Sequence, residues 1–162
     1  MKAKTQALLL EKMMQKHHSH HICEIALPDL IIKKSSLYQL SVGDILLTGL
    51  KSLEPILVHY RLSHTPHYAK LLFLKNTSRR KVKITSIHPI QEKPLKDTKH
   101  EVLKSLFAHI EVNPFECGSM IELDDSLFDS VSLFNQNYDI KVEGKLMNAE
   151  GKIAIEITKV SI

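Results

Sequence analysis

Residues 40–47 read LSVGDILL, and a related stretch, CGSMIEL, returns at residues 117–123. Each stretch joins a glycine and a small polar residue, which favour a turn, to an apolar run of strand length. A chain that repeats a turn-and-strand block is expected to be built from similar modules. Further repeated blocks in the same order would indicate such a modular fold.

Further blocks repeat in the same order along the chain. Because each repeated unit is too small to bury an ample core alone, we expect two modules that pack on each other. The period-2 runs between the blocks predict a mainly β protein. The matched blocks are Ile56 and Val58 with Val131 and Leu133, residues 68–72 with residues 138–142, and residues 82–87 (VKITSI) with residues 155–160 (IEITKV).

The repeated blocks resemble the SpoA (surface presentation of antigens) domain. That domain occurs in the flagellar motor switch proteins FliN and FliM and in the cytoplasmic-ring protein of type III secretion systems, the SctQ family. The family pattern has a Gly-Asp or Gly-Ser turn before an apolar strand, and it closes on an Ile-Thr-x-[Ile/Val] strand. The resemblance covers about residues 22–88 and 107–162, and the tandem arrangement is similar to SctQ.

The resemblance implies two tandem, intertwined β modules, the first pairing with the second. We predict an N-terminal helix and His-rich spacer (1–21), a first module (22–88), a linker (89–106) and a second module (107–162). Apolar spacing predicts short helices within residues 3–16 and around residues 102–110, although 108–113 could instead form a strand. The residues expected to pair the modules are Val42, Ile45, Val58, Ile84, Ile121, Val131, Ile155 and Ile157.

The resemblance also implies a function: a scaffold subunit of the cytoplasmic ring, or sorting platform, of a type III secretion or flagellar export apparatus. Its partners would be other ring subunits, a paired SpoA module and the FliH- or SctL-type stator protein that carries the export ATPase. FliN-like proteins receive that stator on an apolar patch of the third strand. The matching residues are Leu71, Leu72, Phe73, Leu74, Val142 and Leu146, although intertwining could instead bury this run.

The net charge of +4 conceals two oppositely charged halves. Residues 41–90 hold eight basic and two acidic side chains (+6), whereas residues 111–162 hold four basic and ten acidic ones (−6). Such halves attract each other or attract different protein partners. The alternative function is a nucleic-acid-binding β module that uses the basic turn of the first module on the phosphates and Tyr60, Tyr68 and Phe73 as stacking faces. The basic residues of this turn are Lys75, Arg79, Arg80, Lys81 and Lys83.

The search for reaction centres predicts no enzyme and no cofactor. The chain has no phosphate-binding glycine motif and no nucleophile elbow, and Cys23 and Cys117, expected to be small buried side chains, are far apart. The run His17, His18, His20 and His21 could hold a metal ion, but a solvated spacer is favoured. No apolar run approaches the ~20 residues of a membrane span. We therefore expect a cytoplasmic protein, peripheral to the inner-membrane export apparatus.

Overall fold

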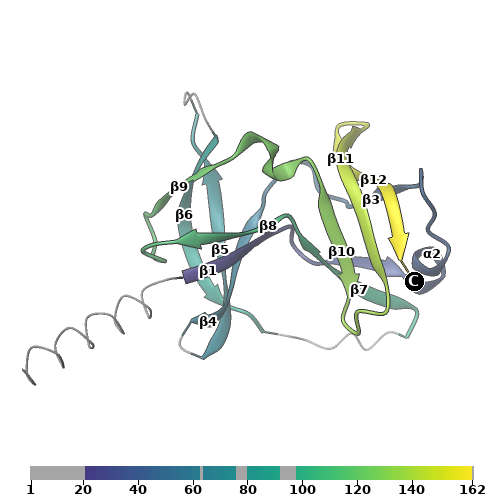
Figure 1. Ribbon diagram of the computed structural model, residues 1–162, viewed down its shortest axis with the longest axis horizontal. Coiled ribbons are helices and arrows are strands. Elements are labelled where there is room, and N and C mark those ends of the chain that lie inside the picture. Colours follow the sequence, from purple (N-terminus) through teal and green to yellow (C-terminus); the bar gives the residue numbers. More distant parts are fainter. Residues whose placement is uncertain (1–20, 63, 76–79, 92–97, 162) are drawn as a thin grey trace, which may run out of the picture.

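The computed structural model describes residues 21–62, 64–75, 80–91 and 98–161. Within these ranges the chain forms two curled, six-stranded antiparallel sheets (Figure 1), so the prediction of a mainly β protein is confirmed. The helical parts are the five-residue helix α2 (Lys34–Tyr38) and the 3-10 turn η1 (Asp125–Phe128). The helix expected within residues 3–16 lies outside the described residues.

Sheet A has the strand order β8-β1-β4-β5-β6-β9, and sheet B has the order β2-β7-β10-β11-β12-β3. The strands of sheet A are β1 (His21–Ala26), β4 (Ile56–Leu62), β5 (Thr65–Phe73), β6 (Arg80–Pro89), β8 (Ala108–Val112) and β9 (Met120–Leu123). The strands of sheet B are β2 (Leu30–Lys33), β3 (Ile45–Leu47), β7 (His100–Leu106), β10 (Val131–Asn135), β11 (Lys141–Ala149) and β12 (Lys152–Ser161).

The two halves of the chain exchange strands. The first half (residues 21–90) supplies the four central strands of sheet A, and the second half (residues 98–161) supplies its two edges, β8 and β9. Sheet B reverses these roles, with β2 and β3 of the first half at its edges. Interchanging the halves converts the strand order of one sheet into that of the other. The internal repeat is therefore a structural duplication in which each half completes the other's sheet.

A long antiparallel ribbon connects the two sheets. Residues 21–33 run against residues 100–112 in one constant register, from His21 opposite Val112 to Lys33 opposite His100. At the bend between β1 and β2, the buried Ser105 hydroxyl accepts the N–H of Leu27 at 2.8 Å and lies 3.3 Å from its carbonyl oxygen. The backbone of Leu27 is thus satisfied where the ladder would otherwise break.

The repeated glycine turns hold the exchanged strands in place. The N–H of Gly43 donates to the carbonyl of Ile157, and the N–H of Ile157 donates to the carbonyl of Asp44, both at 2.8 Å. In the other half Gly118 makes the same bond to Ile84, whose own N–H donates to the carbonyl of Ser119. Both glycines have left-handed backbones, with φ of +94° and +93°. The repeated block therefore connects the two halves, and we call each of these two hydrogen-bonded turns, at Gly43 and at Gly118, a clasp.

A β-bulge explains why the last two inward-facing residues of β6 are three positions apart, and the same bulge occurs in β12. Ile84 and Ile87 both face the core although they are three residues apart, because β6 carries one extra residue, Thr85, opposite β5. The Thr85 hydroxyl donates to the carbonyl of Lys70 at 3.3 Å. In β12 the bulge recurs at Thr158, whose hydroxyl donates to the carbonyl of Glu143 at 3.1 Å. Lys70 and Glu143 are therefore equivalent positions.

These bonds correct two of the predicted block matches. Counting from Lys70 and Glu143, Ala69 is equivalent to Val142, so residues 68–72 were matched three positions out of register. Ala69 pairs with Leu57 and Val142 pairs with Leu133, which makes Leu57 and Leu133 equivalent. The match of Ile56 and Val58 to Val131 and Leu133 is one residue out, and a one-residue slip exchanges the two faces of a strand.

The helix expected around residues 102–110 is also wrong. These residues form β7 and β8, the second leg of the ribbon, so part of the predicted linker lies inside sheet B. The alternative of a strand at 108–113 is confirmed by β8. The apolar side chains of this segment satisfy a helical spacing, but the ladder to β1 and β2 provides more backbone pairing than an isolated helical turn would.

The predicted module-pairing residues fall into three groups. Ile84, Ile121, Ile155 and Ile157 lie on strands that pair with the other half. Val58 and Val131 are buried, but their strands β4 and β10 pair only with strands of their own half, so these two residues do not join the modules through strand pairing. Ile45 also pairs with the other half, opposite Glu156 of β12, but strand alternation leaves its side chain 51% exposed and turns Leu46 inward. Val42 precedes β3 and is 66% exposed, which corrects the expectation for this residue.

The exchange brings the opposite charges together. Residues 108–130 contain six acidic side chains and no lysine or arginine, which accounts for the net charge of −6 in residues 111–162. This segment supplies β8 and β9 and therefore lies on sheet A, the sheet of the basic half. In the ladder between β6 and β9, Lys81 stands opposite Glu122. The rest of the second half, residues 131–162, has four acidic and four basic side chains.

We predict that Gly43→Ala and Gly118→Ala each lower the free energy of unfolding by about 1–2 kcal/mol, because a side chain disfavours the left-handed backbone. Chemical denaturation measures the loss. Gly151→Ala, at φ +79° in the hairpin between β11 and β12, is the control for backbone strain away from the exchange. No loss at one of the two clasp glycines would contradict their equivalence.

We also predict that separately produced fragments 1–90 and 96–162 associate at low salt, and that their affinity falls as salt rises, because the acidic segment 108–130 meets the basic sheet. Glu122→Gln is expected to weaken the association more than Glu150→Gln, which removes the same charge outside that segment. Isothermal titration calorimetry measures both effects. If the two fragments do not associate at low salt, charge does not guide the exchange of strands between the halves.

Candidate functional site

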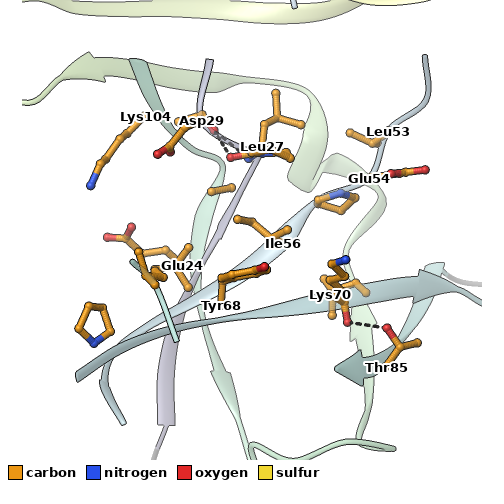
Figure 2. A pocket seen from close by; sticks show the side chains of 18 of the residues that line it. Glu24, Leu27, Asp29, Leu53, Glu54, Ile56, Tyr68, Lys70, Thr85 and Lys104 are labelled. Atoms are coloured by element: carbon orange, nitrogen blue, oxygen red, sulfur yellow. Dashed lines mark hydrogen bonds between the residues drawn. The ribbon is translucent and has the colours of Figure 1, made fainter. Parts of the chain in front are cut away.

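A groove of about 950 Å³ lies on the outer face of sheet A, the face turned away from its buried core (Figure 2). Its floor comes from β1, β4, β5 and β6, and its walls come from the loops before β2 and β4 and from β7 of the other half. The groove therefore exists only in the intertwined structure. Its principal lining residues are Glu24, Ala26, Asp29, Leu53, Glu54, Pro55, Ile56, Val58, Tyr60, Tyr68, Lys70, Leu71, Leu72, Phe73, Thr85 and Lys104.

Strand alternation makes the floor of the groove apolar. In β4, Leu57 points into the core, while Ile56 and Val58 line the groove. In β5, Ala69 points into the core and Tyr68 lies on the groove side, 5.2 Å from the ring of His88. Charged side chains of both signs also lie among the lining residues, but most of the side chains on the floor are apolar.

Among the described residues, the outer face of sheet B is more polar than that of sheet A. The register places Ser132 at the position of Ile56 and Lys145 at the position of Leu72, while Phe134, stacked on Tyr138, stands at the position of Val58. Because the fold duplicates while this surface does not, the duplicated architecture does not require the apolar outer face of sheet A. Such an unshared, hollowed apolar surface is typical of a binding site.

The structure divides the predicted partner-binding run Leu71–Leu74 between core and groove. Leu71 and Phe73 line the groove but also pack against the buried cluster beneath sheet A. Leu72 lies between them and is 54% exposed. Leu74 is half-buried at the end of the strand, and its N–H donates to the carbonyl of Lys81 at 2.8 Å. Of this run, Leu72 is the side chain most available to a partner.

The counterparts in the second half are not surface residues. Val142 is 1% exposed in the core of sheet B, because it is equivalent to the inward-facing Ala69. Leu146 packs against the cores of both sheets. The expectation that these two residues extend an exposed partner surface is corrected by their burial.

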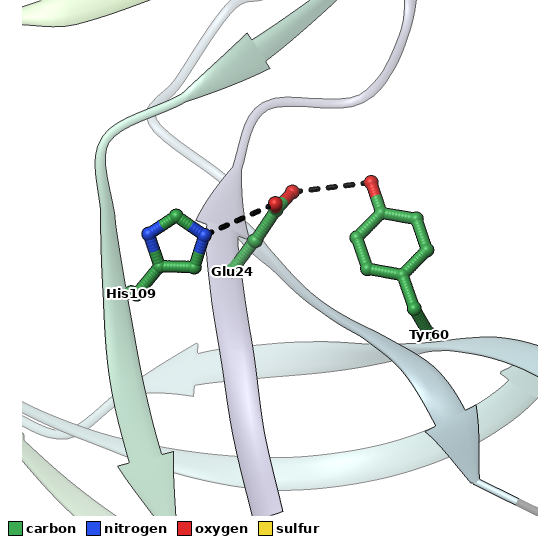
Figure 3. A network of polar contacts seen from close by, with 3 residues as sticks. All are labelled: Glu24, Tyr60 and His109. Carbon is green, nitrogen blue, oxygen red and sulfur yellow. Dashed lines mark hydrogen bonds and ion pairs between the residues drawn. The ribbon is translucent and has the colours of Figure 1, made fainter.

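A polar network lies beside the groove (Figure 3). The Glu24 carboxylate accepts a hydrogen bond from the Tyr60 hydroxyl at 3.1 Å, and its other oxygen lies 3.2 Å from Nε2 of His109. Burial, together with the Glu24 charge and hydrogen bond, raises the pKa of Tyr60. The phenol therefore stays protonated and remains a donor to Glu24. This network joins β4 and β1 of the first half to β8 of the second.

A second polar cluster surrounds His59, which is buried beneath sheet A. Nδ1 of His59 accepts the N–H of Arg61 at 3.1 Å, so the neutral ring carries its proton on Nε2, which lies 2.8 Å from Nδ1 of His21. Phe115 packs edge-on against the His59 ring at 5.0 Å. Burial, His21 and His67 lower the pKa of His59. The cluster thus stabilises the neutral imidazole.

Several of the side chains proposed for nucleic-acid stacking and charge contact other residues of the protein. The Arg80 guanidinium lies 5.4 Å from the centre of the Phe128 ring, and Lys81 is opposite Glu122. Arg79 lies outside the described residues. Tyr60 donates to Glu24, as described above, and Tyr68 and Phe73 contribute to the groove. Lys75 and Lys83 are exposed, and the nucleic-acid alternative stays a prediction.

The cysteines differ in their surroundings. Cys23 is buried, and burial raises the pKa of its thiol to about 12. Cys117 is exposed, which corrects the expectation that both are buried. Among the described residues no three side chains of His, Cys, Asp or Glu gather as metal ligands, and His17, His18 and His20 lie outside that range. In the same part of the chain, no helix has the length and apolar character to cross a membrane.

Sequence reasoning found Leu72 but missed the walls of the groove. Asp29, Leu53 and Lys104 are distant in the sequence, and they meet only because the ribbon bends between the sheets. A signal was available for the floor, since Ile56, Val58 and Tyr60 recur at every second position of β4. No protein-family model and no curated protein matches this chain.

We predict that the protein loses stability as the pH falls below 6.5. The pKa of His59 is lowered in the folded state from a reference value of 6.5, so the unfolded chain binds more protons in that window and unfolding becomes easier. His59→Asn keeps an acceptor for the N–H of Arg61, in the manner of Asn135, whose Oδ1 accepts the N–H of Ile140.

Urea denaturation at several pH values between 7.5 and 5 tests this origin of the pH dependence. The variant is expected to be less stable than the wild type at pH 7.5 but to have a shallower pH dependence. An unchanged slope in His59→Asn would assign the pH dependence to other histidines.

Proposed function

We propose that this protein is a non-catalytic scaffold subunit of the cytoplasmic ring of a type III secretion or flagellar export apparatus, and that the groove on sheet A receives a stator protein of the FliH or SctL type. The observation that carries the proposal is the apolar groove itself. It is large enough for a peptide segment, and among the described residues the equivalent face of sheet B is more polar, with Ser132 and Lys145 at the positions of Ile56 and Leu72.

The exchange of strands supports the proposal. The SpoA resemblance implies two intertwined β modules in one chain, and the two halves here complete each other's sheets through the Gly43 and Gly118 clasps. A subunit built in this way presents rigid surfaces on both sheets, because each sheet is closed by strands of the other half. Rigid, preformed surfaces suit a scaffold, since little conformational entropy is lost when a partner binds.

The chemistry of the groove favours an apolar or amphipathic peptide. Ile56, Val58 and Leu72 offer aliphatic contacts, and Tyr68 adds an aromatic face. Burial of a few large apolar side chains in such a hollow supplies most of the binding energy in peptide complexes. Glu24, Lys70 and Lys104 stand at different points along the lining and provide polar contacts of both signs. They can orient a peptide, whereas the apolar floor provides affinity.

We predict that Leu72→Asp weakens binding to the stator segment at least tenfold without unfolding the protein. The side chain is mostly exposed, so the charge meets solvent in the free protein but an apolar surface in the complex. A pull-down or calorimetric titration with N-terminal segments of FliH- and SctL-type proteins measures binding, and circular dichroism checks the fold. Capture of one segment alone would also identify the apparatus.

Val42→Asp is the matched control, because Val42 is an equally exposed apolar residue that does not line the groove. It is expected to bind as the wild type does. Unfolding of Leu72→Asp would place Leu72 in the core, and equal binding by a folded Leu72→Asp would remove the groove from the interaction. Binding of an oligonucleotide in place of either segment would favour the nucleic-acid alternative.

A further inference from the structure

We propose that β3 is the contact through which two copies of this chain associate, by antiparallel pairing of their β3 strands edge to edge. The pairing would join the two B sheets across a two-fold axis. This inference is independent of the stator groove, which lies on sheet A.

The four sheet edges differ in their protection against such pairing. Edge strands that expose unpaired backbone groups are normally guarded by charged side chains. Among the described strands, β2 carries Lys33, β8 carries Glu111 and β9 carries Glu122, whereas β3 consists of Ile45, Leu46 and Leu47. Of these four edge strands, β3 is therefore the one without a charged side chain, and it is also the shortest.

The outer side chains of β3 are exposed apolar residues. Ile45 is 51% and Leu47 is 73% exposed, while Leu46 between them is buried. Val82 and Ile155 are equivalent positions of β6 and β12. Because Ile121 pairs with Val82 and Leu46 pairs with Ile155, the residues of β9 equivalent to Ile45 and Leu47 are Met120 and Glu122. The fold thus tolerates a carboxylate where β3 has Leu47. The duplication therefore does not explain two aliphatic side chains side by side on this edge.

Self-pairing would give both side chains a partner of their own kind. With Leu46 opposite Leu46 of the partner subunit, Ile45 lies opposite Leu47 of the partner subunit, and the two-fold axis repeats the contact. Directly opposed residues of an antiparallel pair have Cβ atoms about 4.5–5.5 Å apart, so both aliphatic pairs come into contact. The outer faces of the two sheets stay on the same side, because the axis is perpendicular to the sheet.

Charge favours pairing of β3 with β3 of a second copy over pairing of β3 with β9 of a second copy. Residues 131–162, which form the body of sheet B, have no net charge, and Lys145 stands opposite Glu156 beside β3. Two such ends meet without like-charge repulsion. Pairing of β3 with β9 of another copy would instead bring Glu122 against an aliphatic side chain. β3 and β9 also lie toward opposite ends of the molecule (Figure 1), so the β3 edge is not covered by β9.

Sedimentation equilibrium over a range of concentrations tests the proposal on the full chain. We expect reversible dimers whose dissociation constant rises at least tenfold in Leu47→Lys, because lysine guards the edge. Met120→Lys, at the position of β9 equivalent to Ile45, is the matched control and is expected to dimerise normally. A chain that stays monomeric up to about 1 mM, where binding is worth roughly 4 kcal/mol, overturns the proposal. Dimers weakened only by Met120→Lys overturn it as well.

Directed disulfide formation tests the register independently of stability. In a Cys117→Ser background, Ile45→Cys and Leu47→Cys variants are oxidised separately and as an equimolar mixture. Opposed Cβ atoms suit a disulfide, so the mixture is expected to form the mixed dimer in clear excess over either variant alone. Homodisulfides that form as readily as the mixed dimer would show a different register and contradict the pairing of Ile45 with the partner's Leu47.

Discussion

The constant register of the ribbon formed by residues 21–33 and 100–112 is the constraint on which the rest of the structure depends. Each leg passes from one sheet into the other, so both sheets begin on the same pair of strands. Beyond the ribbon, β4–β6 extend sheet A and β10–β12 extend sheet B, while β3 and β9 cross over to close the sheet of the other half. The Ser105 hydroxyl at the bend makes the continuity possible, because it satisfies the backbone of Leu27 away from water.

Strand exchange follows from this ribbon, and it gives the two copies of one module different surroundings. The core positions of the duplicated strands stay apolar in both halves, as at Leu57 and Leu133. The outer positions have diverged, with Ile56 over sheet A and Ser132 over sheet B. A duplicated fold therefore has one apolar groove and one polar face. The acidic segment 108–130 likewise lies on the basic sheet. Opposite charges therefore favour the pairing of a first half with a second half over the pairing of two identical halves.

Much of the architecture could be predicted because the repeated blocks mark structural necessities. The glycine turns require a left-handed backbone, and the Ile-Thr-x-[Ile/Val] endings mark bulges that restore the inward direction of the final side chain. Matches that rested on apolar character alone were less accurate. Val58 and Leu133 are both apolar, yet one lines the groove and the other lies in the core, since a register error of one residue leaves composition unchanged and reverses direction.

The sequence by itself determined the β class, the duplication, the turns and the opposite charges of the two halves, because these depend on local backbone preference and on composition. Only the tertiary structure decided that residues 102–110 form strands, that Val142 is buried while Leu72 is exposed, and that Asp29, Leu53 and Lys104 surround one groove. Those outcomes depend on pairing between distant segments. An isolated segment contains no information about the strand that will lie beside it.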